Sequence, residues 1–207
     1  MTKKSLEYCS LSYLNIWLST DRKCCKALES GNRKEKLEAL KNAASAYRIA
    51  RNLPSKYEEE SGKNRYEPVV EILETVKKPD LGVNPVAKIK EIEKAISKQY
   101  GNRSVLSLTT KFMWLTFKKP VLIYDSQARI ALETPVGDLN AFYSKWKEAY
   151  EAKKHEVAQA CDKLPSVYLY SVDQQQGTKS YVEEIASSDW FRERVFDIYL
   201  WNRGLDS

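Results

Sequence analysis

The sequence contains a single histidine, four cysteines, seven glycines and seven prolines in 207 residues. His155 lies in a run of charged residues and is expected to face solvent, so catalysis or metal binding that depends on histidine is not expected. Of the cysteines only Cys24 and Cys25 are neighbours, and no C-x-x-C pair is present to hold zinc or an iron–sulfur cluster. We therefore expect buried, reduced thiols and a protein that uses no metal and no other cofactor.

Several longer signatures are also missing. The sequence has neither a phosphate-binding P-loop nor a G-x-G-x-x-G dinucleotide motif, which excludes the nucleotide-binding folds built on them. No apolar run approaches the roughly 18 residues that a membrane-spanning helix needs. The N-terminal residues lead into no signal-peptide core. We expect a soluble, cytoplasmic protein that does not associate with membranes.

The residues that are abundant favour helices. Lys, Glu, Ala and Leu are frequent, apolar residues recur every three or four positions, and strand signals are scarce. The predicted helices span 6–18, 32–51, 68–76, 84–96, 107–117, 138–150 and 180–201, with a short helix after Asp125 and a polar loop over 55–66. The fold class is therefore predicted to be all-α. We expect a single domain over 1–207, with one sub-lobe of about 65–135 and another of 1–64 plus 136–207.

Polar residues mark where several of these helices should begin. Asn32 and Glu35 have the spacing of a capping box, and Pro85 is suited to the first turn of the helix that it opens. Gly204 is expected to end the last helix. The predicted N-cap residues are Asn32, Asn84, Ser107, Asp125 and Asp138.

The formal net charge of +6 is concentrated in one segment. Residues 84–119 contain eight basic and two acidic residues, while the rest of the chain contains equal numbers of each. A charge run is often only a solvated face, but this segment carries the whole excess. Its position predicts that a polyanion such as nucleic acid binds there.

The segment 107–131 contains the residues with the clearest chemical meaning. Lys111 lies early in an apolar helix that Pro120 must end, and Asp125 caps the next helix. Where an amine and a carboxylate meet in a cleft, the amine can form a Schiff base at a sugar carbon. The carboxylate can stabilise positive charge on that carbon. Taken singly, Asp125 could be only a helix cap and Lys111 only one more basic residue.

The order of these features resembles a known family. Ser107 and Lys111 on an apolar helix, then proline, then I-Y-D-S and an arginine-containing helix, are similar to the helix-hairpin-helix DNA glycosylase superfamily. The branch resembled is that of bacterial 8-oxoguanine DNA glycosylases. The resemblance covers about residues 84–133 and implies a two-lobed helical fold with the active site between the lobes. It also implies that Lys111 attacks the sugar and that Asp125 stabilises the oxocarbenium ion.

The charge pattern and the resemblance together assign further roles. The expected DNA-contacting residues are Lys98, Arg103, Ser107, Lys118, Lys119, Gln127 and Arg129. A flipped base needs aromatic or apolar partners, and the expected pocket residues are Trp114, Leu115, Tyr124, Trp190 and Phe191. The chain departs from the superfamily in two ways. Its hairpin has V-L-S-L-T-T at 105–110 instead of a glycine-rich turn, and it lacks the four-cysteine cluster of the endonuclease III branch.

The predicted activity is therefore excision of a modified base from double-stranded DNA by a monomer, with strand nicking by lyase chemistry. The substrate is left open between an oxidised purine such as 8-oxoguanine and a hypermodified phage base such as glucosylated hydroxymethylcytosine. The first would mean DNA repair and the second anti-phage defence. The alternative from another class is a non-catalytic DNA-binding or interaction module.

Overall fold

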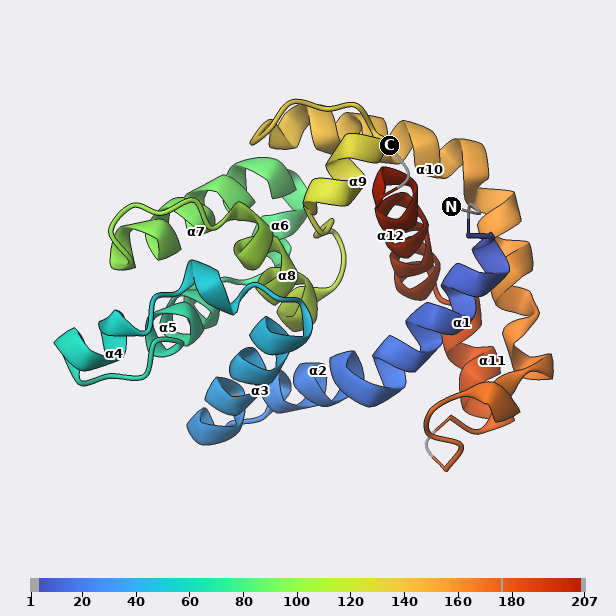
Figure 1. The fold of residues 1–207 in the computed structure, drawn as a ribbon, viewed down its shortest axis with the longest axis horizontal. Helices are drawn as coiled ribbons and strands as arrows, with labels where there is room; N and C mark the ends of the chain where they lie inside the picture. Colours follow the sequence, from blue (N-terminus) through green and yellow to red (C-terminus); the bar gives the residue numbers. More distant parts are fainter. Residues whose placement is uncertain (1–3, 176, 206–207) are drawn as a thin grey trace. The chain divides into compact units, whose positions relative to one another are not determined.

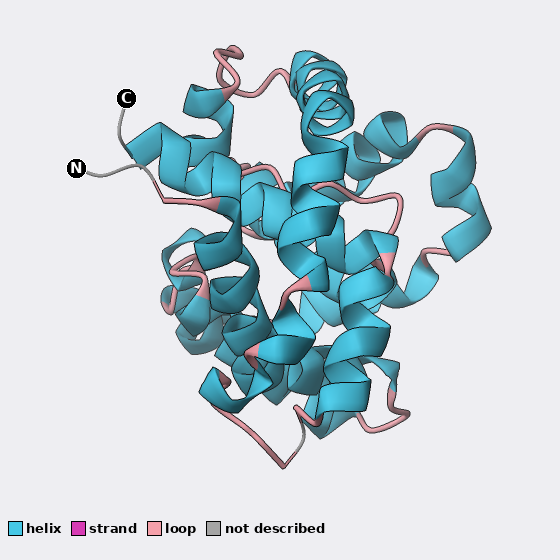
Figure 2. Cartoon of the chain, turned by 90° about the vertical axis from the view of Figure 1, so that its right-hand side faces the viewer, coloured by secondary structure: helices cyan, strands magenta, loops and turns pink. Residues whose placement is uncertain are grey.

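The computed structural model describes residues 4–175 and 177–205. Within these residues every regular element is helical and no strand is formed (Figures 1 and 2). The predicted all-α class is thus confirmed. None of the helices in this part of the chain combines the length and the apolar character that crossing a bilayer requires.

The α-helices of the described residues are α1 (Leu6–Ile16), α2 (Arg22–Glu29), α3 (Arg33–Ala46), α4 (Lys56–Ser61), α5 (Glu67–Thr75), α6 (Lys78–Val83), α7 (Pro85–Gln99), α8 (Leu106–Phe117), α9 (Ser126–Ala131), α10 (Leu139–Asp162), α11 (Lys179–Ser187) and α12 (Asp189–Leu205). A π-helical segment, η1 (Trp17–Asp21), connects α1 to α2. The remaining helical turns are the 3₁₀ segments η2 (Ala50–Asn52), η3 (Leu164–Ser166) and η4 (Tyr168–Tyr170).

The chain forms two compact units. The central unit is Thr20–Ile123, and the terminal unit combines Met1–Ser19 with Tyr124–Ser207. The sub-lobes expected from the sequence, about 65–135 and 1–64 plus 136–207, have other limits than these compact units. The difference arises because α2 and α3 pack against α8, and α9 packs against α12. As a result Lys111 belongs to the central unit and Asp125 to the terminal unit.

The core of the central unit is built around α8. Residues 108–115 of this helix are all buried, which is typical of a helix that is apolar on every side. Phe112 meets Tyr66 edge to face, with ring centroids 6.4 Å apart. The apolar face of α7 covers another side through Ile89, Ile92 and Ile96.

The core of the terminal unit surrounds α12, which contacts α1, α9, α10 and α11. It contains a buried ion pair in which Arg194 Nη1 donates to Asp197 Oδ2 at 2.7 Å. Trp146 Nε1 donates to the other oxygen at 2.7 Å. Burial raises the pKa of Asp197, while Arg194 and Trp146 act in the opposite direction. Because Arg194 and Trp146 each donate to a different oxygen, both carboxylate oxygens of Asp197 have a donor, as a buried charge requires.

Four of the five predicted N-caps are confirmed. Asn32 accepts from the N–H groups of Lys34 and Glu35, and its side-chain amide donates to the Glu35 carboxylate. The other three side chains each accept one backbone N–H of the first turn of α7, α9 or α10, at 3.0 Å; they are Asn84, Asp125 and Asp138. Ser107 was predicted wrongly. It is the second residue of α8, and Val105 is the N-cap.

Several predicted helix limits were also wrong. The first helix ends at Ile16, and the π-helical segment η1 and then α2 follow it without a break. The loop predicted over 55–66 contains α4, and α6 was not predicted. The last predicted helix is divided at Ser188, whose backbone is extended, into α11 and α12. Gly204 lies within α12 instead of ending it.

The early end of α3 has a clear local cause. Arg48 adopts a left-handed conformation with φ 55°. Its N–H donates to Ser45, and the N–H of Ile49 donates to Ala44, which is the Schellman pattern of a helix C-terminus. Glycine usually occupies this left-handed position, so an arginine there gives no sequence cue.

Gly204 allows α12 to pack closely against α9. A Cβ atom at this position would lie 2.0 Å from the carbonyl oxygen of Gln127, two residues after Asp125. No side chain fits at that distance. The absence of a side chain at Gly204 thus fixes how deeply the first turn of α9 sits on α12.

We expect Gly204→Ala to lower the free energy of unfolding by about 1–3 kcal/mol, because the added methyl group must push the backbone of α9 away. Urea unfolding would measure the change. Gly82→Ala is the matched control, since Gly82 lies in α6 with nothing within 4 Å of its would-be Cβ. The free energy of unfolding of this control should rise by about 0.5–1 kcal/mol. A Gly204→Ala protein as stable as the parent would show that α9 can shift away from the added methyl group without loss of stability.

Candidate functional site

Lys111 is a buried amine in the middle of α8. Its side chain is 4% exposed, and its Nζ donates to Ser107 Oγ at 2.7 Å, one helical turn earlier. Ser107 thus interacts with the predicted nucleophile and does not cap the helix. Lys111 is the one charged residue of α8. A charge placed on an otherwise apolar helix needs local polar partners, and Ser107 is one of them.

The turn between α7 and α8 lies at the surface, where residues 101–104 are exposed. Gly101 and Asn102 both have positive φ, at 74° and 58°. The side chains of Lys98 and Arg103 are exposed on either side of this turn. The N–H of Val105 donates to the Glu93 carboxylate at 3.2 Å, so a carboxylate already occupies part of the N-terminal end of α8.

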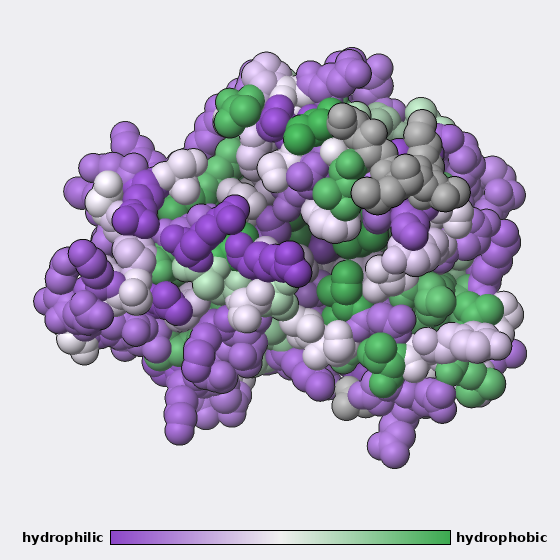
Figure 3. Space-filling view, in the orientation of Figure 1, coloured by the Kyte–Doolittle hydropathy of each residue, from purple (hydrophilic) through white to green (hydrophobic). Residues whose placement is uncertain are grey.

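A basic stripe precedes this turn. Lys90, Lys94 and Lys98 follow one another at intervals of four residues on α7, and all three are exposed. This spacing places them along one side of the helix. Figure 3 shows hydrophilic and apolar side chains side by side on the face that it draws. The stripe and Arg103 are exposed basic residues of the segment that was predicted to bind a polyanion.

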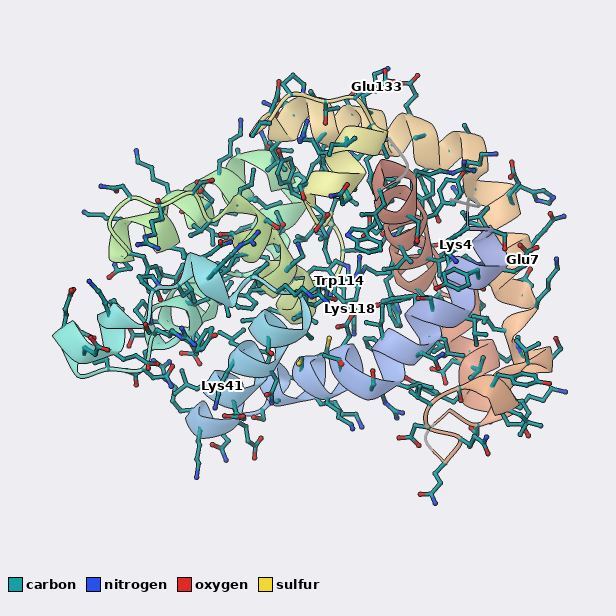
Figure 4. All side chains as sticks on the ribbon, viewed as in Figure 1. Lys4, Glu7, Lys41, Trp114, Lys118 and Glu133 are labelled. Carbon is teal, nitrogen blue, oxygen red and sulfur yellow. The ribbon has the colours of Figure 1, made fainter. Side chains whose placement is uncertain are left out.

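Lys118, at the end of α8, has a strained backbone. It lies one helical turn beyond Trp114, and its N–H donates to the Trp114 carbonyl at 2.8 Å (Figure 4). Its φ of 54° and ψ of −119° form a conformation that glycine favours and a lysine rarely adopts. Such strain costs on the order of 1–3 kcal/mol and is most often retained at functional positions. The neighbouring Lys119 is exposed.

Asp125 caps α9 in the terminal unit. Its Oδ1 accepts the N–H of Gln127 at 3.0 Å, and its side chain is half-buried. Gln127 contributes its carbonyl to the close contact with Gly204. Arg129 Nη1 donates to the Thr134 carbonyl at 2.7 Å and thereby closes the turn that follows α9. Within this unit the structure brings together Asp125 and Gln127.

The predicted pocket residues are mainly core residues. Trp114, Leu115, Tyr124 and Phe191 are buried, and Trp190 is half-buried. Phe191 packs on Tyr13, and Trp190 packs on Trp17, with ring centroids 5.0 and 4.5 Å apart. The hydroxyl of Tyr124 accepts the N–H of Gly137 at 2.8 Å. Their role in holding a base stays a prediction.

Two residues close to Lys111 carry no signal in the sequence. Asp21, at the end of η1, is 0% exposed, and both of its carboxylate oxygens accept from the Tyr47 hydroxyl, at 2.8 and 3.0 Å. The ring of Tyr47 lies under the Lys111 amine, with Nζ 5.9 Å from the ring centroid. Tyr47 follows α3 directly, so these contacts join segments far apart in the chain.

The thiols are buried, as expected, and are not disulfide-bonded. Burial raises the pKa of Cys24 to about 11 and that of Cys25 to about 12. It likewise raises the pKa of Cys9 to about 11 and that of Cys161 to about 12. These groups stay protonated at neutral pH, so they are poor nucleophiles and metal ligands. Across the described ranges no three acidic, cysteine or histidine side chains cluster as a metal site would require.

Comparison with protein-family models, curated proteins and solved structures gave no significant match to this chain. Its function must therefore be inferred from its own residues. The amine of Lys111 and the carboxylate of Asp125 stay the two groups for which the sequence predicts a chemical role.

The strain at Lys118 leads to a test. We expect Lys118→Gly to raise the free energy of unfolding by about 1 kcal/mol, because glycine adopts this conformation without a Cβ clash. The same variant should bind double-stranded DNA more weakly, because a basic side chain is lost. Lys119→Gly removes the same charge from a neighbour that does not have positive φ. This control should lose about 0.4–1 kcal/mol of stability. No gain in stability for Lys118→Gly would show that the conformation is not strained.

Proposed function

We propose that this protein is a DNA glycosylase that excises a modified base from double-stranded DNA, with the two-lobed fold of the helix-hairpin-helix superfamily. The observation that carries the proposal is the Lys111 amine, buried on the second helix of a hairpin whose first helix bears an exposed basic stripe. The next helix along the chain begins with the carboxylate of Asp125. These are the groups that base excision with a covalent intermediate requires.

In the proposed reaction the lone pair of the Lys111 amine forms a bond with C1′ of the flipped nucleotide. The electrons of the glycosidic bond leave with the base, which takes up a proton, while the attacking nitrogen loses one. Asp125 stabilises the positive charge that develops on the sugar. Ring opening gives an imine, and loss of a C2′ proton then expels the 3′ phosphate and nicks the strand.

The basic segment supports DNA as the partner. The net charge of +6 lies within residues 84–119, and the stripe on α7 exposes three of its lysines. Phosphate binding releases counterions, so affinity should fall steeply as salt rises. The family resemblance supports an oxidised purine such as 8-oxoguanine as the substrate, and a divergent hairpin suits a specialised substrate such as glucosylated hydroxymethylcytosine in phage DNA. We propose action as a cytoplasmic monomer in either repair or anti-phage defence.

Borohydride trapping on DNA that contains an abasic site tests the covalent chemistry. The parent should form a reduced adduct, and Lys111→Gln should form none because the nucleophile is absent. Lys111→Arg keeps the charge but should also form no adduct, since a guanidinium is not a nucleophile at neutral pH. Lys98→Gln is the matched control; it removes a lysine from the hairpin and should still be trapped at saturating DNA.

The outcomes separate three mechanisms. Strand nicking by Lys111→Arg at the parent's rate would contradict the Schiff base. The mechanism that remains would be one in which an activated water attacks the sugar and Asp125 stabilises the charge. A parent that binds DNA but gives no adduct, and releases no base from a panel of modified DNAs, would favour the non-catalytic module. The panel should include 8-oxoguanine DNA and glucosylated phage DNA, because these represent the two proposed substrates.

Asp125→Asn should abolish base excision while DNA affinity stays close to that of the parent. The amide still caps α9 but carries no charge for the transition state, a loss of about 3 kcal/mol or more, which slows the reaction at least a hundredfold. The rate of single-turnover excision would measure this decrease. Asp138→Asn is the matched control, because Asp138 caps α10 through the same kind of hydrogen bond, at 3.0 Å to the N–H of Ala141. Near-normal excision by Asp125→Asn would remove Asp125 from the mechanism.

A further inference from the structure

A fully buried acid, Asp21, is linked to Lys111 through Tyr47. Asp21, Tyr47 and Lys111 all lie in the central unit, where α2 and α3 pack against α8 (Figure 1). Asp21 is fully buried, although an aspartate is among the residues least often found inside a protein. Its position directly before α2 would suit an N-cap, but its side chain makes no cap hydrogen bond to that helix. It accepts the Tyr47 hydroxyl through both oxygens instead.

The helical segment that ends at Asp21 is of an unusual type. Asp21 is the last residue of η1, and π-helical turns of this kind are rare and occur frequently at functional sites. Tyr47 is the C-cap residue of α3 and precedes the left-handed Arg48. The hydrogen bond between the two side chains thus joins the end of η1 to the end of α3. This hydrogen bond fixes the tilt of the Tyr47 ring.

The ring that is fixed in this way faces the amine. The distance of 5.9 Å from Lys111 Nζ to the centroid of Tyr47 is within the range in which an ammonium group is attracted to an aromatic face. Ser107 Oγ holds the same nitrogen at 2.7 Å. The amine is therefore bounded by a hydroxyl of its own helix and by a ring from another helix.

We infer that Tyr47 and Asp21 are positioning residues for Lys111. Asp21 anchors the Tyr47 hydroxyl, and the anchored ring keeps the Lys111 amine in one place and direction at the point from which it attacks. The inference rests on the proposed function for what the amine attacks. It goes beyond that function because neither residue belongs to the motif that carries the family resemblance.

The experiment compares four variants with the parent: Tyr47→Leu, Tyr47→Phe, Asp21→Ala and Asp21→Asn. The first readout is borohydride trapping on abasic-site DNA over a range of DNA concentrations, which separates the trapping rate at saturation from the half-saturating concentration. The second uses no DNA. It is reductive methylation of Lys111 by formaldehyde and cyanoborohydride, followed by mass spectrometry of the Lys111 peptide. Tyr57→Leu is the control, because Tyr57 also stacks on another ring of the central unit, that of Tyr100.

We expect Tyr47→Leu to lower the trapping rate at saturation about tenfold or more, because small displacements of a reacting group reduce rates strongly. The half-saturating DNA concentration should stay within about twofold of the parent's, since Tyr47 is not placed in the DNA-binding stripe. Methylation of Lys111 should become faster, because loss of the ring opens the amine to a small reagent. Tyr47→Phe keeps the ring face but not its anchor, so it should fall between the parent and Tyr47→Leu.

The variants of Asp21 test the anchor separately. Asp21→Asn still offers an oxygen to the Tyr47 hydroxyl and should retain more of the trapping rate than Asp21→Ala. The inference is overturned if Tyr47→Leu traps at the parent's rate, or if the trapping rates of the variants and of Tyr57→Leu simply follow their free energies of unfolding, as a purely structural role predicts. A parent that forms no adduct would contradict the proposed covalent chemistry. The methylation assay would then still decide whether Tyr47 holds the amine, because slower or unchanged methylation in Tyr47→Leu overturns that role.

Discussion

The burial of the Lys111 amine is the constraint on which the central unit depends. The helix α8 is apolar on every side and supplies a core for the unit, yet it contains one cation. An ammonium group removed from water is strongly unfavourable unless polar groups surround it. Ser107 meets this need from the same helix and the Tyr47 ring from α3. A helix that served only as a core would have an apolar residue at this position, and this is the reason for proposing a role for Lys111 beyond packing.

Local features of the fold could be predicted from the sequence, and features that depend on distant residues could not. The caps at Asn32, Asn84, Asp125 and Asp138 form within one helical turn, so a few neighbouring residues determine them. The helix ends were less accurate, because α3 ends at a left-handed arginine. Gly204 was misassigned for a related reason. Glycine usually ends a helix, but here its lack of a side chain serves a contact with Gln127, a residue 77 positions earlier.

The same distinction applies to the candidate site. Lys111 and Asp125 were found because each lies at a recognisable place in a helix, and the structure confirms both helices. Ser107 was assigned to the correct neighbourhood but to the wrong interaction, since its hydroxyl contacts an amine and not a backbone N–H. Asp21 and Tyr47 could not be found from the sequence. Their significance depends on the packing of α2 and α3 against α8, and no local sequence pattern predicts this packing.

The two candidate groups are held by different means. Asp125 is fixed through its backbone, because the first turn of α9 rests on α12 where Gly204 leaves room for the Gln127 carbonyl. Lys111 has a long, flexible side chain, so a well-placed backbone alone does not fix its nitrogen. Side-chain contacts must do this, and Ser107 and Tyr47 provide them. The carboxylate therefore depends on close helix packing, while the amine depends on side-chain contacts. This difference explains why Tyr47, held by Asp21, matters for Lys111 and has no counterpart in the contacts described for Asp125.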